Sequence, residues 1–382
     1  MRIGVPKEVL EGERRVAVVP RMVEQLREDS HEVHIERDAG KGSFFLNSEY
    51  EKAGALLAPH AKDLYTDVEM ILKIHPPTKC EVEMMNPRST YIGFLFAASR
   101  REIIRYMKEK SITSFAMECI PRLARTQSMD ALSSMASIAG YRAVLMAANH
   151  LGKFFPLLMT AAGTIPPAKV LILGAGVAGL QAIATARRLG AHVEAFDTRP
   201  AVREQVESLG AHFVEMEPVK DAETASGYAK EMTEEFLKKE REVIGNRITL
   251  NDVVITTAQV FGGKAPILIT EEMVKTMKRG SVIVDLAAEQ GGNCELSEVG
   301  KTIVKYDIVI CGEANLQSTL PVDASSMYSK NIVTFFRHLH PTKDSSFDFE
   351  DEITKSTCIT HDGKIKNEVV EKAFEKELNA HD

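Results

Sequence analysis

The sequence has no excess of positive charge, and this absence excludes several kinds of partner. Lysine and arginine together number 47 against 54 aspartates and glutamates, which gives a formal net charge of −7 over 382 residues. Binding to nucleic acid or to anionic lipid headgroups depends on clustered cations. We therefore expect no nucleic-acid partner and no binding to an anionic membrane surface through charge.

Cysteine is also scarce, and its positions form no motif. The five cysteines are scattered along the chain, and no two form a C-x-x-C pair. Disulfide-rich secreted domains and structural zinc sites both use paired or regularly spaced cysteines. The sequence therefore predicts a reducing compartment, no disulfide framework and no bound metal.

Long apolar runs are missing as well. No stretch reaches the ~18 uninterrupted apolar residues that cross a bilayer. The start "MRIGVPKE" is charged and lacks the apolar region of a secretory signal. We expect a soluble chain that does not insert into a membrane itself, so any membrane role would need a partner.

What is present is an alternation of strand and helix patterns. Short apolar runs at residues 2–5, 33–36 and 69–74 predict strands, and residues 20–30 carry apolar side chains at helical spacing. The later runs "DVVITTA", "SVIVDLA" and "DIVICG" are rich in valine and isoleucine, which is typical of buried parallel strands. Alternation of this kind predicts an α/β fold with mostly parallel sheets, and the length favours two domains.

Two long helical patterns divide the chain. Residues 128–151 predict one long helix, and residues 323–339 predict a second that returns the chain to its first domain. We therefore expect two Rossmann-like domains. The first would be discontinuous and the second would bind the nucleotide, with these bounds: 1–132 plus 322–382, and 133–321.

Two further segments complete the expected organisation. The polar stretch 216–240 predicts a solvated excursion or mobile loop without core residues, and residues 351–365 predict a small helix followed by a hairpin.

A glycine motif opens the second domain. Gly174, Gly176 and Gly179 form G-x-G-x-x-G between the strand pattern "KVLIL" and a helix pattern, and Asp197 ends the next strand. The glycines permit a tight turn, close approach to a pyrophosphate, and close packing of helix on strand. The helix N-terminus would supply N–H groups to the phosphates.

Asp197 would accept hydrogen bonds from the adenosine ribose, which favours NAD(H) over NADP(H), although Arg199 is a contrary signal. The remaining candidate cofactor-binding residues are Val177, Ala178, Thr198, Thr257, Ala258 and Gln259.

The segment "PRLARTQSMDALSS", residues 121–134, is polar but contains neither histidine nor lysine. A dehydrogenase that oxidises an alcohol or an amine needs a general base near its cofactor. An alternative interpretation is a capped helix start, with Ser128 or Asp130 as the cap, but this leaves Arg122 and Gln127 unexplained.

Two other pairs of polar residues follow strand patterns. Asp285 and Glu289 come after a buried run, where ligands collect in parallel sheets, but a helix cap or turn explains them equally well. Lys73 and His75 follow a strand of the first domain, and a histidine beside two prolines is more often a turn residue than a catalyst.

The segments "PRLARTQSMDALSSMASIAGYRA", "TAAGTIPPAKVLILGAGVAGLQAIATARRLGA", "GYAKEM" and "VDLAAEQGGNC" resemble the NAD(H)-binding component of proton-translocating nicotinamide nucleotide transhydrogenase. The resemblance runs to about residue 335. It implies that the cofactor lies in the cleft between the two domains. It also implies which residues surround the nicotinamide, namely Arg122, Gln127, Asp130 and Ser133, and that a mobile loop with Gly227 and Tyr228 closes over the nucleotide.

The same resemblance implies partners and a location. NADP(H) would be held by a partner component, and a membrane-spanning component would carry protons. This chain would be a homodimer, bound peripherally at the cytoplasmic face of the inner membrane or its equivalent. Hydride transfer between two nicotinamide rings releases no proton, which explains the missing base.

More distantly, the chain resembles alanine dehydrogenase. In that enzyme a histidine acts on the substrate two residues before the element "AASR", and Leu95 occupies this position here. Glu289 stands at the position of an aspartate, whereas Arg15 and Lys73, which hold the substrate carboxylate there, remain. An alanine dehydrogenase-like enzyme and a non-catalytic NAD-sensing module are therefore the alternatives.

Overall fold

The computed structural model describes residues 1–216, 234–260, 263–340 and 346–378. The chain divides into two compact units, Met1–Met135 with Ser318–Asp382, and Ala136–Gln317. Each unit is an α/β structure built on a mostly parallel sheet, which confirms the predicted fold class. Whether the expected domains fold independently at the boundaries given above stays a prediction.

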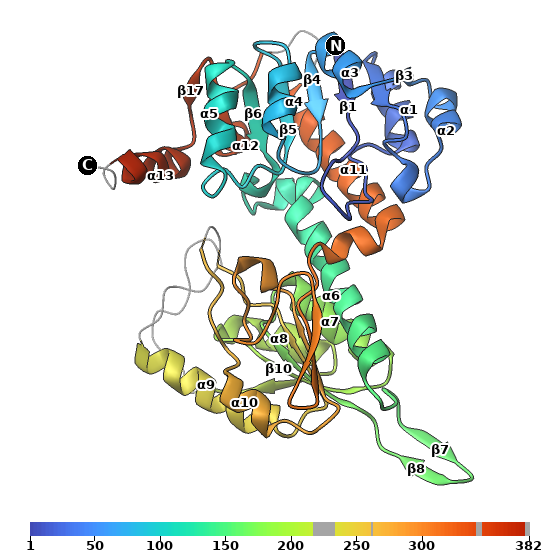
Figure 1. The fold of residues 1–382 in the computed structure, drawn as a ribbon, viewed down its shortest axis with the longest axis vertical. Coiled ribbons are helices and arrows are strands. Elements are labelled where there is room, and N and C mark those ends of the chain that lie inside the picture. The colour runs from blue at the N-terminus through green and yellow to red at the C-terminus, as the bar shows by residue number, and fades with distance from the viewer. Residues whose placement is uncertain (217–233, 261–262, 341–345, 379–382) are drawn as a thin grey trace. The chain divides into compact units, whose positions relative to one another are not determined.

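The first unit contains a sheet of eight strands in the order β17-β16-β6-β5-β4-β1-β2-β3 (Figure 1). Strands β1 to β6 pair in parallel, and β16 and β17 are antiparallel additions from the C-terminal region of the chain. Their bounds are β1 Arg2–Val5, β2 Glu32–Glu36, β3 Leu56–Ala58, β4 Met70–Leu72, β5 Thr90–Gly93, β6 Thr113–Ala116, β16 Cys358–His361 and β17 Lys364–Ile365.

The helices of this unit begin where the sequence supplies stop and start signals. Thr78 caps α4, because its hydroxyl accepts the N–H of Glu81 and the Glu81 carboxylate accepts the N–H of Thr78. Pro321 opens α11, which buries Phe335 and Phe336. The helices are α1 Pro20–Glu28, α2 Asn47–Lys52, α3 Ala61–Asp67, α4 Lys79–Met84, α5 Arg101–Glu109, α11 Pro321–Leu339, α12 Glu352–Thr357 and α13 Glu368–Leu378.

The second unit contains a sheet of seven strands in the order β11-β10-β9-β12-β13-β15-β14. Only β14 runs antiparallel to its neighbour, and the central strands are fully buried on both faces. The strands are β9 Lys169–Leu173, β10 His192–Phe196, β11 His212–Val214, β12 Val253–Thr256, β13 Val282–Asp285, β14 Thr302–Lys305 and β15 Ile308–Cys311; the helices are α7 Val177–Arg188, α8 Arg203–Ser208, α9 Glu234–Ile248 and α10 Glu271–Thr276.

The direction of the second sheet reverses between β9 and β12. The chain moves outward from β9 through β10 to β11, then returns to β12 on the other side of β9. At such a reversal the loops that follow the two central strands diverge, which leaves the crevice where parallel sheets bind ligands. The glycine motif follows β9, so it lies at this crevice.

The long helix predicted from Ser128 begins later than expected. Residues Ala124–Met129 form a 3₁₀ turn, the backbone leaves helical geometry at Asp130 with ψ of 86°, and α6 spans Ala131–His150. By length and composition α6 could cross a membrane, but 44 % of its apolar window is buried inside the protein. A core helix of a folded domain passes the same test.

Three features of the second unit differ from the expectation or were missed. Strands β7 (Leu158–Thr160) and β8 (Gly163–Ile165) form a separate hairpin that extends away from the seven-stranded sheet (Figure 1). Strand β14 was not predicted either. The polar stretch 216–240 is not free of core residues, because Phe236 on α9 is 3 % exposed.

Candidate functional site

The glycine turn after β9 has the geometry that a dinucleotide needs. Gly174 has a φ of +97°, and its N–H donates to the Phe196 carbonyl at 2.8 Å. A Cβ at Gly179 would lie 1.9 Å from the Gly174 oxygen, whereas a Cβ at Gly176 would meet no atom within 4 Å. The third glycine therefore serves packing, and the second faces open space at the start of α7.

The N-terminus of α7 is available to a ligand. Gly176 is its N-cap residue, and no side chain caps the first turn. Val177 and Ala178 follow directly and are partly or well exposed. The first N–H groups of a helix carry a partial positive charge and favour a phosphate.

Asp197, at the end of β10, is tied to this turn. Its Oδ2 accepts the N–H of Ala175 at 2.7 Å, and its carboxylate also forms an ion pair with Arg199 at 2.9 Å. Thr198 lies between these two residues in the same turn and is half-buried. The structure thus brings the predicted ribose-binding residue to the predicted pyrophosphate-binding turn.

The loop after β12 joins the same crevice. The Thr257 hydroxyl donates to the Gly174 carbonyl at 3.0 Å, and the side chain of Asn293 binds both peptide groups of Ala258, at 3.0 and 2.9 Å. Gln259, which is exposed, donates to the Leu286 carbonyl at 3.0 Å. The loop is therefore held from both sides, and the fully buried Asn293 is a positioning residue that sequence reasoning missed.

Asp285 acts behind this loop rather than on a ligand. Its buried carboxylate accepts hydrogen bonds from two hydroxyls and three main-chain N–H groups, those of Thr256, Ser297, Ala287, Asn293 and Cys294. This set accounts for its acceptor positions, so the turn interpretation explains Asp285. Glu289 is exposed and accepts the N–H of Asn315 at 3.3 Å.

In the first unit, Asp130 caps α6. Its Oδ1 accepts the N–H of Ser133 at 2.8 Å, and its Oδ2 accepts the Ser133 hydroxyl at 2.6 Å. The capped-helix interpretation therefore accounts for these two residues as they stand. It does not account for Arg122 and Gln127, whose side chains are exposed on the preceding turn.

A distant helix fixes the shape of that turn. Asn331 of α11 donates its side-chain N–H to the Ser128 carbonyl at 2.9 Å, and the buried Thr126 hydroxyl donates to the Pro121 carbonyl at 2.6 Å. No sequence motif marks Asn331, because it lies 203 positions from its partner.

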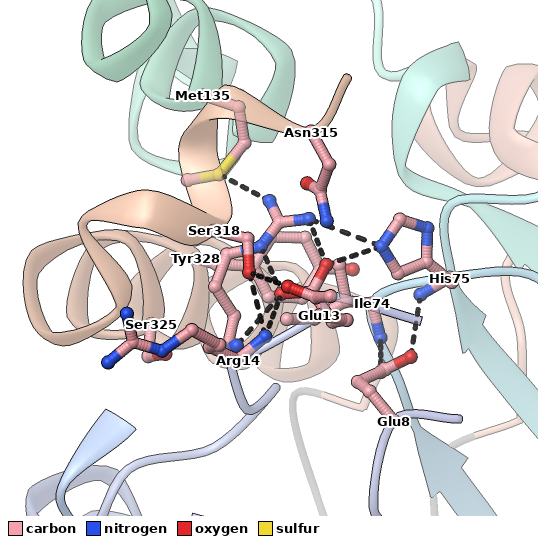
Figure 2. Close-up of polar contacts among 12 residues, drawn as sticks. Glu8, Glu13, Arg14, Ile74, His75, Met135, Asn315, Ser318, Ser325 and Tyr328 are labelled. Atoms are coloured by element: carbon pink, nitrogen blue, oxygen red, sulfur yellow. Dashed lines mark hydrogen bonds and ion pairs between the residues drawn. The ribbon is translucent and has the colours of Figure 1, made fainter. Parts of the chain in front are cut away.

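The carboxyl ends of β1 and β4 carry a buried charged cluster (Figure 2). Arg15 donates to Glu13 at 2.6 and 2.8 Å, and Glu13 also lies 2.6 Å from His75. Burial alone would raise the pKa of Glu13, but the hydrogen bonds from Arg15 and His75 hold it well below its usual range. Lys73 donates to Glu8 at 2.8 Å. A small carboxylate that bound to Arg15 or Lys73 would have to share or displace these partners.

The position of the missing histidine is filled by packing. Leu95 is fully buried, and its N–H donates to the Glu118 carboxylate at 3.0 Å, as does the N–H of Phe96. Burial raises the pKa of Glu118 to about 7. Because its oxygens face main-chain N–H groups, Glu118 anchors this loop and does not replace the histidine.

Two predicted residues and the metal question concern limits of the described chain. Gly227 and Tyr228 lie outside the described residues. Among the residues that the structure does describe, no group of three or more histidine, cysteine, aspartate or glutamate side chains could hold a metal ion.

Residues 4–139 match the family described as alanine dehydrogenase/PNT, N-terminal domain, and residues 143–368 match the C-terminal domain of the same family. An NAD(P) transhydrogenase subunit alpha polypeptide of Rhodospirillum rubrum is 46 % identical over 375 residues, covering 96 % of this chain and 97 % of that protein. Alanine dehydrogenase 2 of Staphylococcus aureus is 30 % identical over 393 residues, covering 100 % and 98 %. The crystal structure of transhydrogenase from Sinorhizobium meliloti superposes with a TM-score of 0.87 at 41 % identity, covering 96 % of this chain and 100 % of that one.

Proposed function

The chain belongs to the alanine dehydrogenase/PNT family, and on that premise we propose that it binds NAD(H) and exchanges hydride with NADP(H) held by a partner component. Its similarity to NAD(P) transhydrogenase alpha subunits confirms the resemblance predicted from the sequence. The chain is therefore an oxidoreductase component of a complex. The further proposals are the transfer between opposite faces of the two nicotinamides, known as Re/Si specificity, and its coupling to proton translocation.

The observation that carries the proposal is the crevice at the reversal of the second sheet. Gly176 faces open space, the first turn of α7 has no side-chain cap, and Asp197 lies beside the same turn. A pyrophosphate at the helix N-terminus and a ribose at Asp197 fit these groups. Thr257, Ala258 and Gln259 would line the pocket, with their loop held in place by Asn293.

The chemistry proposed for this chain needs no general base. Hydride passes between the C4 atoms of two nicotinamides without release of a proton, so the protein must orient the ring, with reacting atoms about 3 to 3.5 Å apart. We assign this orientation to Arg122, Gln127, Asp130 and Ser133. Leu95, buried where a related dehydrogenase has a histidine, is consistent with this chemistry.

The partners are inferred in the same way. We propose an NADP(H)-binding component and a membrane-spanning proton-channel component, with this chain peripheral at the cytoplasmic face of the inner membrane or its equivalent. We also propose a homodimer. The β7–β8 hairpin supports this, because Leu157 and Met159 are 54 % and 76 % exposed and residues 154–168 carry no charge. A two-stranded hairpin is marginally stable in water without a partner surface.

An alanine dehydrogenase-like activity is the second candidate, because Arg15 and Lys73 are both present in the first unit. It predicts NADH formation from alanine at rates typical of enzymes, roughly 1 s⁻¹ or faster. The transhydrogenase proposal predicts no such turnover. A non-catalytic NAD-sensing module would bind NADH but transfer no hydride even with the partner present.

The decisive experiment mixes the chain with a soluble NADP(H)-binding component and follows a single turnover by stopped flow. Gln127→Asn should slow transfer ten- to a hundredfold, since a displacement near 1 Å costs about a hundredfold in rate. The NADH dissociation constant should stay within about threefold, because the glycine turn and Asp197 supply most of the contacts. Gln205→Asn makes the same change on the exposed face of α8 and serves as the control.

The outcomes separate the interpretations. Normal transfer and binding in Gln127→Asn would return the segment to a capped helix start. Weak NADH binding with normal transfer at saturation would make Gln127 an anchor only. Asp197→Ala should weaken NADH binding by roughly 1 to 3 kcal/mol, and unchanged binding would refute the ribose assignment.

A further inference from the structure

The chain itself uses all the acceptor positions of the Asp197 carboxylate. Oδ2 accepts the Ala175 N–H at 2.7 Å and Nη2 of Arg199 at 2.9 Å. Oδ1 accepts the main-chain N–H of Arg199 at 2.8 Å and its Nε at 2.9 Å. A carboxylate offers about four acceptor sites. A ribose diol can therefore bind to Asp197 only if some of these bonds are released.

The bonds differ in what their release requires. The N–H groups of Ala175 and Arg199 belong to the main chain of two turns, so they move only if the turns change shape. The two guanidinium bonds break when one side chain rotates. The Arg199 side chain is 19 % exposed and that of Asp197 is 6 % exposed, so the arginine has the freer path toward solvent.

Other nearby cations are committed elsewhere. Arg203 pairs with Glu207 at 2.9 Å and with Glu215 at 2.6 Å, and Arg241 donates its Nε to the Ile267 carbonyl at 3.0 Å. The carboxyl of Glu240 is close enough to Asp197 for the two to repel each other. Within the described residues of the chain, Arg199 is the cation in contact with Asp197.

We propose that Arg199 is a specificity-determining residue: it leaves Asp197 when an adenosine ribose binds, and beside that ribose it lessens the preference for NAD(H) over NADP(H). The inference rests on the proposed function, since it requires a dinucleotide at the glycine turn. Asp197 alone would repel a 2′-phosphate. A released guanidinium, two residues away, presents the forked N–H pair that phosphate oxygens accept.

The test compares the NADH and NADPH dissociation constants of Arg199→Met with those of the unmodified full chain by fluorescence titration. Methionine keeps an apolar stem and removes the charge and the donors. We expect the ratio of the NADPH constant to the NADH constant to rise at least tenfold. Arg203→Met removes the same charge four residues later without contact to Asp197, and its ratio should stay within twofold.

Arg199→Lys keeps the charge without the fork and should give an intermediate ratio, which also tests the inference if the methionine variant folds poorly. A ratio within twofold of the unmodified chain in both Arg199 variants would overturn the inference, and so would an equal change in Arg203→Met. These outcomes are distinct from failure of the proposed function, in which the unmodified chain binds neither nucleotide or Asp197→Ala leaves NADH binding unchanged.

Discussion

Glu118 is a buried carboxyl group whose contacts are main-chain N–H groups of the loop after β5. Burial raises its pKa from 4.5 to about 7, and burial likewise raises the pKa of Glu240 to about 7. A folded-state pKa above the unfolded value means that the folded protein holds its proton more tightly. The stability from this effect is complete below pH ~4.5 and is lost as the pH rises to ~7.

We predict that Glu118→Gln flattens this range of the pH profile. The shift in Glu118 corresponds to roughly 3 kcal/mol of unfolding free energy between about pH 4.5 and 7, and glutamine cannot titrate. Urea unfolding at pH 5 and pH 8 measures the difference. Glu242→Gln, an exposed change on α9, should keep the slope of the unmodified chain. Equal slopes in Glu118→Gln and the unmodified chain would show that the carboxyl titrates normally.

At the scale of elements, the glycine turn separates a packing requirement from a ligand requirement. A methyl group at Gly179 would collide with the Gly174 carbonyl, whereas one at Gly176 would extend into open space. Gly176 has φ of −77° and ψ of −167°, an extended conformation that alanine adopts without strain. The two positions are therefore a matched pair for one substitution.

Gly179→Ala should lower the unfolding free energy by at least about 2 kcal/mol, as expected for overpacking. Gly176→Ala should keep its stability within about 0.5 kcal/mol. If the pyrophosphate sits at this helix N-terminus, the new methyl group should also weaken NADH binding at least tenfold. Thermal unfolding and NADH titration of both variants measure these effects. Gly176→Ala with normal NADH affinity would contradict the pyrophosphate assignment.

The elements that sequence patterns predicted correctly are those with strong periodicity. The buried runs of β9, β12, β13 and β15 and the helix α11 could be predicted because their burial repeats along the sequence. The start of α6 could not, since Ser128 satisfies the cap preference as well as Asp130 does. The choice was made by Asn331, which binds the Ser128 carbonyl and stabilises the 3₁₀ turn.

The candidate site was predictable in its motifs and not in its supports. The glycines and Asp197 follow spacing rules that the chemistry of a dinucleotide imposes. Asn293 carries no such signal, because its role is to bind both peptide groups of Ala258 from another loop. The pairing of Arg199 with Asp197 was hidden as well, although the two residues are neighbours, because spacing does not reveal which groups already occupy a carboxylate.

At the scale of the whole molecule, the proposed homodimer makes a specific demand on the β7–β8 hairpin. We predict that Met159→Asp shifts the chain from dimer to monomer in analytical ultracentrifugation, because a charge would replace an apolar side chain in the interface. Val304→Asp, at a 63 % exposed apolar residue of β14, is the matched control and should remain dimeric. A Met159→Asp variant that stays dimeric would place the interface elsewhere.

The eight-stranded sheet of the first unit takes its last two strands, β16 and β17, from residues 358–365. During synthesis on the ribosome, the N-terminal residues emerge first but lack these strands, as well as α11, until almost the whole chain has been made. The unit formed by residues 136–317 is contiguous and has all its strands well before then. The order of completion is therefore the reverse of the order in the gene: the nucleotide-binding half can finish folding while the half encoded first is still waiting for its edge. During that interval β6 presents an unpaired edge, to which nascent-chain chaperones would have access.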